Sequence, residues 1–457
     1  MIFTRFSAVL TCVASRGLLA LALGLTAVSP ASADENVAIE PRRVDARPGP
    51  VTQEESAELT LREAMGLMQK LNPELAASAR EIGALEGATL QAGLWRNPQL
   101  GVEVEDIGAT QGRGLQRFTT LRIGQAVELG GKRQARVTAA SLAQEVAMQA
   151  YEAKRLELLA RVADAFVDVL AGQERTRLAA ESVALAQDVV TAVARRVQAG
   201  KAPPIEETKA KLALSTARIE QEQARRDLAA GRKRMTLLWG NPSPRFEQAL
   251  GNLASVAILP SFDILAERVR RSPVAARDRK SVEQRSAVLA LERTRRVPDI
   301  TVVAGVRNYS QSGENTPLVG VSIALPLFDR NQGNLLEAHR RLDKAEDERA
   351  ATDFRLQSEL TQAYEALLAA TNEIGVLRDE VLPGASSAFS VANRGYELGK
   401  FGFLEVLDAQ RTLFQNRVLY LRALTNYRKL VNEIERLTAA PIDDKSDWPV
   451  RLSGDKP

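Results

Sequence analysis

Four short segments of the chain alternate between apolar and polar residues, which is the period-2 pattern of a strand with one apolar face. The apolar rows are Leu100, Val102 and Val104; Leu121, Ile123 and Val127; Ile300, Val302, Ala304 and Val306; and Val319, Val321, Ile323 and Leu325. Links rich in glycine and polar residues, 108–114 and 310–317, join the segments in pairs. We therefore predict two β-hairpins, with strands at about 98–106 and 118–128, and at about 299–308 and 318–327.

A longer apolar period follows each predicted hairpin. Leu156, Leu159, Ala163, Phe166 and Leu170 have the 3-4-3-4 spacing of a coiled coil. A helix from Lys132 to Gln198 would span roughly 100 Å at about 1.5 Å per residue. Gly200 and Gly399 stand where such helices end, because glycine favours the C-terminal cap. We predict helical hairpins over about 132–239 and 333–438. A further helix is predicted before each β-hairpin, near 60–95 and 262–296.

The two halves of the chain repeat one pattern. Asn72-Pro73 recurs as Ser272-Pro273, and Asn97-Pro98 recurs as Val297-Pro298, each 200 residues later. Gly200-Lys201 recurs as Gly399-Lys400, 199 residues later. The sequence therefore predicts two copies of one unit, at 59–240 and 262–440, joined by a linker at 241–261.

The N-terminus has the features of an export signal. Arg5 and Arg16 precede an apolar run at 18–25, and the small residues Ala31-Ser32-Ala33 follow it. We predict a signal peptide over 1–33 that is cleaved after Ala33, then a flexible arm over 34–58; a C-terminal tail occupies 441–457. Cys12 precedes the apolar run instead of following it, which argues against lipidation. Its removal leaves a mature chain without thiols.

Composition excludes most catalytic chemistry. The 457 residues include 61 basic and 57 acidic side chains, a net charge of +4, so nucleic acid is not an expected partner. A single histidine, His339, stands beside Arg340 and Arg341, and it favours an exposed position over a metal site. Zinc sites, Cys-His dyads and Ser-His-Asp triads all require more histidine or cysteine than this. We predict neither enzyme activity nor a metal or cofactor site.

The predicted strands have the length of membrane-crossing strands. About ten residues cross a bilayer when tilted, and a strand in lipid cannot leave its edge unpaired. Four strands from one chain are too few to close a barrel. Two chains would give eight strands, whose interior side chains fill, whereas three chains would give twelve and leave a lumen. This favours a homotrimer around a pore; the alternative is a pair of soluble hairpins packed on helices.

Several motifs resemble those of the TolC family of outer-membrane channel proteins, and in particular its CzcC-like cation-efflux branch. The resemblance to the family rests most on Tyr396-Glu397-Leu398-Gly399-Lys400 and residues 403–409. The resemblance to the branch rests on Leu94-Trp95-Arg96-Asn97-Pro98, residues 125–133 and residues 326–333. The resemblance covers roughly residues 58–440. It implies a mostly α protein with a small β part: a trimer whose 12-stranded outer-membrane β-barrel, in contact with lipid, joins a periplasmic α-helical coiled-coil barrel. It also implies an adaptor (a membrane fusion protein) and an inner-membrane RND pump as partners, and cobalt, zinc or cadmium ions as substrates.

The same resemblance implies a gate at the helical tips. The positions that match the family's acidic rings are Glu206, Glu405 and Asp408, and Tyr396 matches a gate aromatic. Helix dipoles alone would also favour carboxylates at Glu206 and Glu405, whereas Asp408 lies deeper in its helix. Phe401 stands where many members have a gate arginine, and Arg394 and Lys400 are the candidate replacements. The candidate adaptor contacts are Gly200, Lys201, Gly399 and Lys400, with simple helix caps and solvated turns as the alternative.

Three other functions remain open at this point. The channel could export drugs or secreted proteins instead of metals. A periplasmic coiled-coil adaptor is a second alternative, although adaptors carry one helical hairpin between lipoyl-like β-modules and this chain has two hairpins in tandem. An enzyme is disfavoured by the shortage of histidine and cysteine, and by the lack of a glycine-rich phosphate loop.

Overall fold

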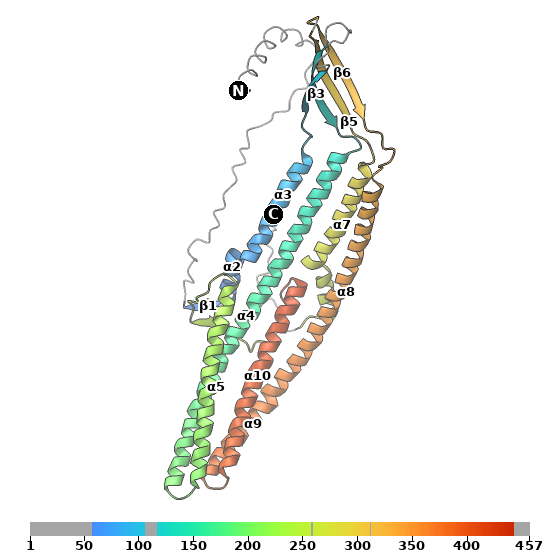
Figure 1. Ribbon diagram of the computed structural model, residues 1–457. Helices are drawn as coiled ribbons and strands as arrows, with labels where there is room; N and C mark the ends of the chain where they lie inside the picture. The colour runs from blue at the N-terminus through green and yellow to red at the C-terminus, as the bar shows by residue number, and fades with distance from the viewer. Residues whose placement is uncertain (1–56, 106–116, 257–258, 311, 443–457) are drawn as a thin grey trace, which may run out of the picture. The chain divides into compact units, whose positions relative to one another are not determined.

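The computed structural model describes residues 57–105, 117–256, 259–310 and 312–442. These residues belong to one compact unit, Glu54–Pro457. The predicted signal peptide (1–33), nearly all of the predicted arm (34–58) and most of the predicted tail (441–457) lie outside the described residues. The unit is mostly helical with one small sheet, as the sequence predicted. The sheet lies at one end of helices α3, α4, α7 and α8, and the turns that close the two helical hairpins lie at the other end (Figure 1).

The two hairpins form one four-stranded antiparallel sheet in the order β2-β3-β5-β6. The strands are β2 (Gln99–Glu105), β3 (Phe118–Val127), β5 (Ile300–Tyr309) and β6 (Asn315–Ile323). Pairing of β3 with β5 joins the two halves of the chain, from Val127 opposite Ile300 to Phe118 opposite Tyr309. Strands β2 and β6 each have a single neighbour, so they are the edges of the sheet.

The last strand is displaced from the predicted 318–327. It begins at Asn315 and ends at Ile323, and Pro317 lies within it, opposite Val306. Proline is tolerated there because an edge strand leaves one row of amides unpaired. Leu325 and Leu327 continue the apolar alternation beyond Ile323. The prediction therefore placed the end of this strand too late.

The two faces of the sheet differ in polarity. The apolar face carries Leu100, Val102, Leu121, Ile123, Val302, Val306, Val319, Val321 and Ile323, all of them exposed. On the opposite face Arg122 pairs with Glu103 at 3.4 Å. Arg307, on the same face, pairs with Glu105 at 3.5 Å and donates to Thr120 Oγ1 at 3.2 Å. A sheet in water normally exposes its polar face and buries its apolar one, so this sheet is built for apolar surroundings on one side.

The first half of the chain contains four helices: α2 (Leu61–Leu71), α3 (Pro73–Gly93), α4 (Lys132–Gln198) and α5 (Pro204–Leu237). The single helix predicted near 60–95 is therefore two helices. Asn72 separates them: its side chain accepts a hydrogen bond from the Leu75 amide at 2.9 Å and donates to the Leu238 carbonyl oxygen at 2.7 Å. Pro73 then starts α3 at the position where its missing N–H costs nothing.

The second half repeats this order with one irregularity. Its helices are α6 (Phe262–Arg270), α7 (Pro273–Thr294), α8 (Gln332–Val376), α9 (Leu382–Glu397) and α10 (Phe403–Thr438). The predicted helix from 333 to 398 is interrupted by a π-helical turn, η1 (Leu377–Val381). Pro383 lies two residues after this turn. Because proline has no amide to donate, the regular hydrogen-bond pattern is interrupted here and the preceding turn widens.

Helix α4 is the centre of the packing. It contacts α3, α5, α7 and α10, while α10 also packs against α8 and α9. Two buried clusters lie where the helices of each half converge, one around Leu158, Phe166 and Met235 and the other around Leu360, Tyr427 and Ile434. The sequence pattern did not reveal a short parallel pair, β1 (Glu58–Thr60) with β4 (Gln248–Leu250). It ties the end of the predicted arm, at Glu58, to the predicted linker.

None of the helices in the described ranges is both long enough and apolar enough to cross a membrane.

Candidate functional site at the helical tips

The two helical hairpins close in the same way. We call residues 196–206 the first tip and residues 395–405 the second tip. Gly200 (φ 67°) and Gly399 (φ 72°) adopt the left-handed conformation that side chains disfavour. After each glycine a lysine amide returns to the helix: Lys201 N donates to the Arg196 carbonyl oxygen and Lys400 N to that of Gly395, both at 2.8 Å. These are Schellman caps, so the glycines have a structural role whatever else they contact.

Tyr396 joins the second tip to the first. Its side chain is 4% exposed, and its hydroxyl donates a hydrogen bond to Glu206 Oε2 at 3.1 Å, across from α9 to α5. Its ring packs against Phe403, with centroids 6.0 Å apart. Burial and the neighbouring Glu206 carboxylate raise the pKa of Tyr396 to about 12. The phenol is therefore a neutral hydrogen-bond donor at every physiological pH.

Arg196 also crosses between the tips, and no sequence pattern had singled it out. Its guanidinium lies over the Tyr396 ring, 4.4 Å from the centroid, and its Nη1 donates to the Tyr396 carbonyl oxygen. We call Arg196, Glu206 and Tyr396 the tip clasp. Arg394 and Lys400, the candidate replacements for a gate arginine, form no ion pair within the described residues. The cation that reaches across comes instead from the first tip.

Gly395 explains why the contact is one-sided. It is the counterpart of Arg196 in the repeat, since 395 − 196 = 199, the offset that relates the two tips. A Cβ atom at Gly395 would clash with the Phe401 ring, which occupies the space that a side chain would need. Phe401 therefore packs within the turn, at the position where many family members have a gate arginine. The asymmetry between Arg196 and Gly395 is the one signal in the sequence that could have identified the clasp.

The three acidic candidates differ in their surroundings. Glu206 is half-buried and its carboxylate is engaged by Tyr396. Glu405 and Asp408 are exposed, in the first and second turns of α10. The repeat offset makes Glu206 the counterpart of Glu405 and Lys209 the counterpart of Asp408. Within one chain, only Glu206 and Tyr396 of the predicted gate residues are brought into contact.

An apolar cluster holds the two tips in position. It joins α4 and α5 to α9 and α10 through Val189, Val190, Val193, Ala210, Leu214, Ala392, Phe403 and Val406. The clasp lies at the end of this cluster, so its geometry is set by packing as well as by its own hydrogen bonds.

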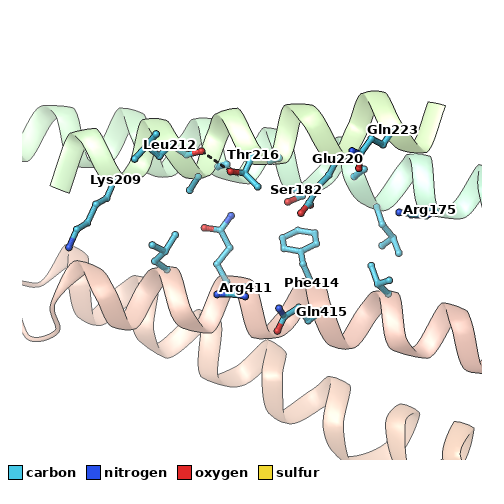
Figure 2. Close-up of a pocket in the computed structure, with 18 residues that line it drawn as sticks. Arg175, Ser182, Lys209, Leu212, Thr216, Glu220, Gln223, Arg411, Phe414 and Gln415 are labelled. Carbon is cyan, nitrogen blue, oxygen red and sulfur yellow. Dashed lines mark hydrogen bonds between the residues drawn. The ribbon is translucent and has the colours of Figure 1, made fainter. Parts of the chain in front are cut away.

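A groove of about 820 Å³ runs beside the tips, between α4 and α5 on one side and α10 on the other. Figure 2 shows Lys209, Leu212, Thr216 and Glu220 on the α5 side facing Arg411, Phe414 and Gln415 on α10. Its charged lining is mainly cationic, with Arg175, Lys209 and Arg411 against Glu220. The groove therefore combines apolar and basic residues.

A second charged cluster lies where the sheet meets the helices. Lys132 Nζ lies 2.5 Å from Asp299 Oδ1, and Arg136 lies 2.6 Å from Glu128 Oε1. Arg96 reaches both acids, at 3.3 Å from Glu128 and 3.6 Å from Asp299. These ion pairs connect the two repeats at the base of the sheet and fix the chain just before β2 and β5.

The described residues contain no group of three or more histidine, cysteine or acidic side chains placed to hold a metal ion. His339 is exposed on α8.

Comparison with known proteins shows the following similarities. The family model described as "Outer membrane efflux protein" matches residues 64–241 and 254–440. The chain is 38% identical over 385 residues to the cobalt-zinc-cadmium resistance protein CzcC of Cupriavidus metallidurans, covering 84% of this chain and 91% of that protein. It is 28% identical over 303 residues to the nickel-cobalt-cadmium resistance protein NccC of Alcaligenes xylosoxydans xylosoxydans, covering 66% of this chain and 67% of that protein. The fold matches a crystal structure of CusC that was determined to follow folding and transmembrane channel formation. The TM-score is 0.72 at 16% identity, and the match covers 83% of this chain and 92% of that chain.

Proposed function

The chain belongs to the outer membrane efflux protein family, and from this premise we propose that it is the outer-membrane channel of a tripartite efflux system. Three copies form a passive duct. The channel receives its substrate from a periplasmic adaptor and an inner-membrane RND pump, and it releases the substrate outside the cell. Because the family is one of efflux proteins, we assign the chain no catalytic step.

The observation that carries this proposal is the sheet. Its apolar face is exposed, and its opposite face carries the ion pairs of Arg122 and Arg307. Among the described residues of one chain, no further strand pairs with its edges, β2 and β6. Closing three such sheets edge to edge pairs every strand in a barrel of twelve. The apolar faces then contact lipid and the polar faces line the lumen.

Divalent heavy-metal cations are the substrates we propose, because the chain aligns over 84% of its length with a cobalt-zinc-cadmium resistance protein. The described residues hold no candidate metal cluster. We therefore propose that the ions pass along the channel without coordination by this chain, and that the pump selects them.

We propose that the tips form the gate and the adaptor contact. In a trimer Glu206, Glu405 and Asp408 would each occur three times around the axis, where clustered carboxylates would concentrate cations. Tyr396 would hold the two tips of each copy together through Glu206, in support of a closed state. Gly200, Lys201, Gly399 and Lys400, at the ends of the hairpins, would meet the adaptor.

The test combines particle mass with conductance. We expect the detergent-purified mature chain to have the mass of a trimer and to form channels in planar bilayers. We further expect Asp408→Asn to weaken block by Co²⁺, Zn²⁺ or Cd²⁺ added on the side of the tips. Glu346→Gln, an exposed carboxylate of α8 distant from the tips, is the matched control. A monomer that remains soluble without detergent would refute the channel, and unchanged block in Asp408→Asn would remove Asp408 from the gate.

A further inference from the structure

We propose that a socket beneath the free edge of β2 receives the Phe328 side chain of a second copy of this chain. The proposal rests on the trimeric channel proposed above and identifies a contact that would join neighbouring copies outside the sheet. The inserting segment follows β6, and the socket precedes β2.

The inserting segment presents apolar side chains to the outside. All residues from 321 to 330 are exposed, and among them Phe328 is 91% exposed. Leu325 and Leu327 are exposed beside it. Large apolar side chains gathered on one segment usually mark a contact with another molecule.

Hydrogen bonds fix this segment to the neighbouring helix. Asn331 Nδ2 donates to both the carbonyl oxygen and the carboxylate of Glu292 on α7, each at 2.8 Å. The Asn331 amide donates to Asp329 Oδ1 at 2.8 Å, and the Arg330 amide donates to Gln332 Oε1, also at 2.8 Å. Phe328 is thus held outward by a tied turn, which reduces the entropy lost when it is inserted.

The socket is a cavity of about 570 Å³ at the end of α3. Its apolar wall consists of Ala88, Ala92, Leu94 and Trp95. On its polar side Glu128 pairs with Arg136 and Arg96, and Gln91 and Asn97 complete the lining. Trp95 is 65% exposed in the single chain, so the cavity is open to an apolar partner.

Strand topology brings the two features together. All three pairings within the sheet are antiparallel, and β6 runs toward the helices while β2 runs away from them. Joining β6 of one copy to β2 of the next continues this alternation. Phe328 comes five residues after Ile323, where β6 ends, and Trp95 comes four residues before Gln99, where β2 begins. The segment and the socket therefore reach the same level of the barrel wall.

The charge at the rim of the socket is complementary to that of the inserting segment. Arg133 lies over the Trp95 ring, 4.8 Å from its centroid, and forms no ion pair among the described residues. Asp329 is exposed directly after Phe328. Insertion of Phe328 would bring this carboxylate to the side of the socket that carries Arg133 in the neighbouring copy.

A cysteine pair tests the contact directly. The mature chain is expected to lack cysteine, so Phe328→Cys combined with Ala92→Cys introduces the only two thiols. We expect a short bismaleimide to convert the purified double variant into covalent dimers and trimers on denaturing gels, and each single variant to stay monomeric. Phe354→Cys with Ala92→Cys is the matched control. Phe354 is also an exposed phenylalanine, but it lies roughly 33 Å further along α8.

A second measurement, the temperature at which the trimer dissociates, tests the contact if the cysteine variants assemble poorly. Ala92→Phe fills the socket from within, so we expect it to lower the temperature at which the trimer dissociates by several degrees. Phe328→Ala should lower this temperature too. Combined, the two changes should cost less than the sum of their separate effects, because the new ring occupies the space that Phe328 vacates.

The outcomes separate this contact from the proposed channel. Additive effects, or a trimer of normal mass without cross-links between positions 92 and 328, would overturn the socket and leave the channel intact. A wild-type particle with the mass of a monomer would instead contradict the channel itself.

Discussion

Tyr396 is held by interactions that are individually weak. The hydrogen bond to the Glu206 carboxylate is worth about 1.5–3 kcal/mol, and the Arg196 guanidinium over the ring adds about 0.5–2 kcal/mol. The tip clasp therefore contributes only a few kcal/mol per chain. A partner that binds the separated tips more tightly than the joined ones by a similar amount would shift the equilibrium between them. This suits a gate that is opened by binding and not by chemistry.

Removing the Tyr396 hydroxyl should loosen the proposed gate. In Tyr396→Phe the ring still packs against Phe403 and Arg196, but the Glu206 carboxylate loses its donor. We therefore expect the open probability to rise at least about tenfold, which corresponds to about 1.5 kcal/mol. Single-channel recording measures this directly. Tyr364→Phe is the control, because the Tyr364 hydroxyl makes no hydrogen bond among the described residues while its ring packs edge-on against Phe262.

The raised pKa of Tyr396 determines how the open probability depends on pH. Because the folded-state pKa is raised from the usual 10 to about 12, the clasp is fully present below pH 10 and is lost as the pH rises through about 12. Open probability should therefore show no step from Tyr396 between pH 6 and 9. If Tyr396→Phe and the wild type had equal open probabilities, the clasp would have no part in gating.

The sequence predicted part of this site. The resemblance of residues 396–400 and 403–409 to the family placed Tyr396 and the acidic residues at the tips. Arg196 was missed because its role depends on contact between segments 200 residues apart. The apolar periodicity within either segment does not indicate that contact. Gly395 looked like an ordinary helical glycine until Phe401 was seen to occupy its space.

The sheet contains a glycine whose role is steric. At Gly305 a Cβ atom would overlap the Leu121 carbonyl oxygen on the neighbouring strand β3. On both sides of Arg122 the paired residue is a glycine, Gly101 on β2 and Gly305 on β5, so the arginine side chain can lie across the polar face. Small and large residues thus alternate across the strands on this face.

We expect Gly305→Ala to weaken the pairing of β3 with β5. The methyl group forces the backbones apart, at a cost of about 1–3 kcal/mol. The thermal midpoint of the purified protein in detergent, followed by circular dichroism, should fall by several degrees. Gly320→Ala is the control on the same face, because no atom lies within 4 Å of its Cβ position. Equal midpoints for the two variants would contradict the steric explanation.

The contact between α4 and α10 includes a carboxylate that burial disfavours. Asp164 Oδ1 accepts a hydrogen bond from Asn432 Nδ2 at 2.9 Å. Burial raises the pKa of Asp164, and the nearby carboxylates of Asp168 and Glu433 add to this, although Asn432 and Lys429 oppose it. The ionised form therefore costs stability once the pH exceeds the folded-state pKa, and the cost disappears as the pH falls and the group takes up a proton.

Asp164→Asn should raise the thermal midpoint at pH 7, since the amide accepts the same hydrogen bond without a buried charge. The gain should shrink as the pH is lowered toward 4. Asp168→Asn, which removes the 2.7 Å ion pair with Lys429, should give no gain at any pH. A gain for Asp164→Asn that does not change with pH would mean that packing, and not charge, is responsible.

Alternation and helix-capping signals predicted the type and order of most elements. They failed where two signals conflicted or where tertiary contact decides. Apolar residues beyond Ile323 displaced the end of β6, and Pro383 produced the turn η1 within a pattern that reads as one helix. The three-residue strands β1 and β4 are too short to show a period. Their parallel pairing connects segments almost 190 residues apart in the chain.

At the scale of the molecule, a single chain is incomplete. It exposes an apolar sheet face, two unpaired strand edges and the Phe328 segment, while the helical part has its own buried clusters. Strand length and the need to satisfy backbone groups in lipid predicted that several copies must meet. The pairing of β3 with β5, which makes each chain contribute one continuous arc of four strands, could not be read from the separate hairpins.

The orientation of that arc can be tested with two neighbouring residues of β6. Val321 lies on the apolar face and is 69% exposed, and Ser322 lies on the polar face. Arginine facing lipid costs up to about 2–4 kcal/mol, depending on its depth, whereas arginine facing a water-filled lumen costs little. We therefore expect Val321→Arg to reduce the amount of heat-stable trimer in outer membranes severalfold, and Ser322→Arg to assemble normally and lower the conductance for cations. Because the residues are adjacent, they share depth and strand, and only the direction of the side chain differs. If Ser322→Arg were the variant that failed to assemble, the sheet would face the opposite way, with its ion pairs toward the lipid, and the proposed lumen would be wrong.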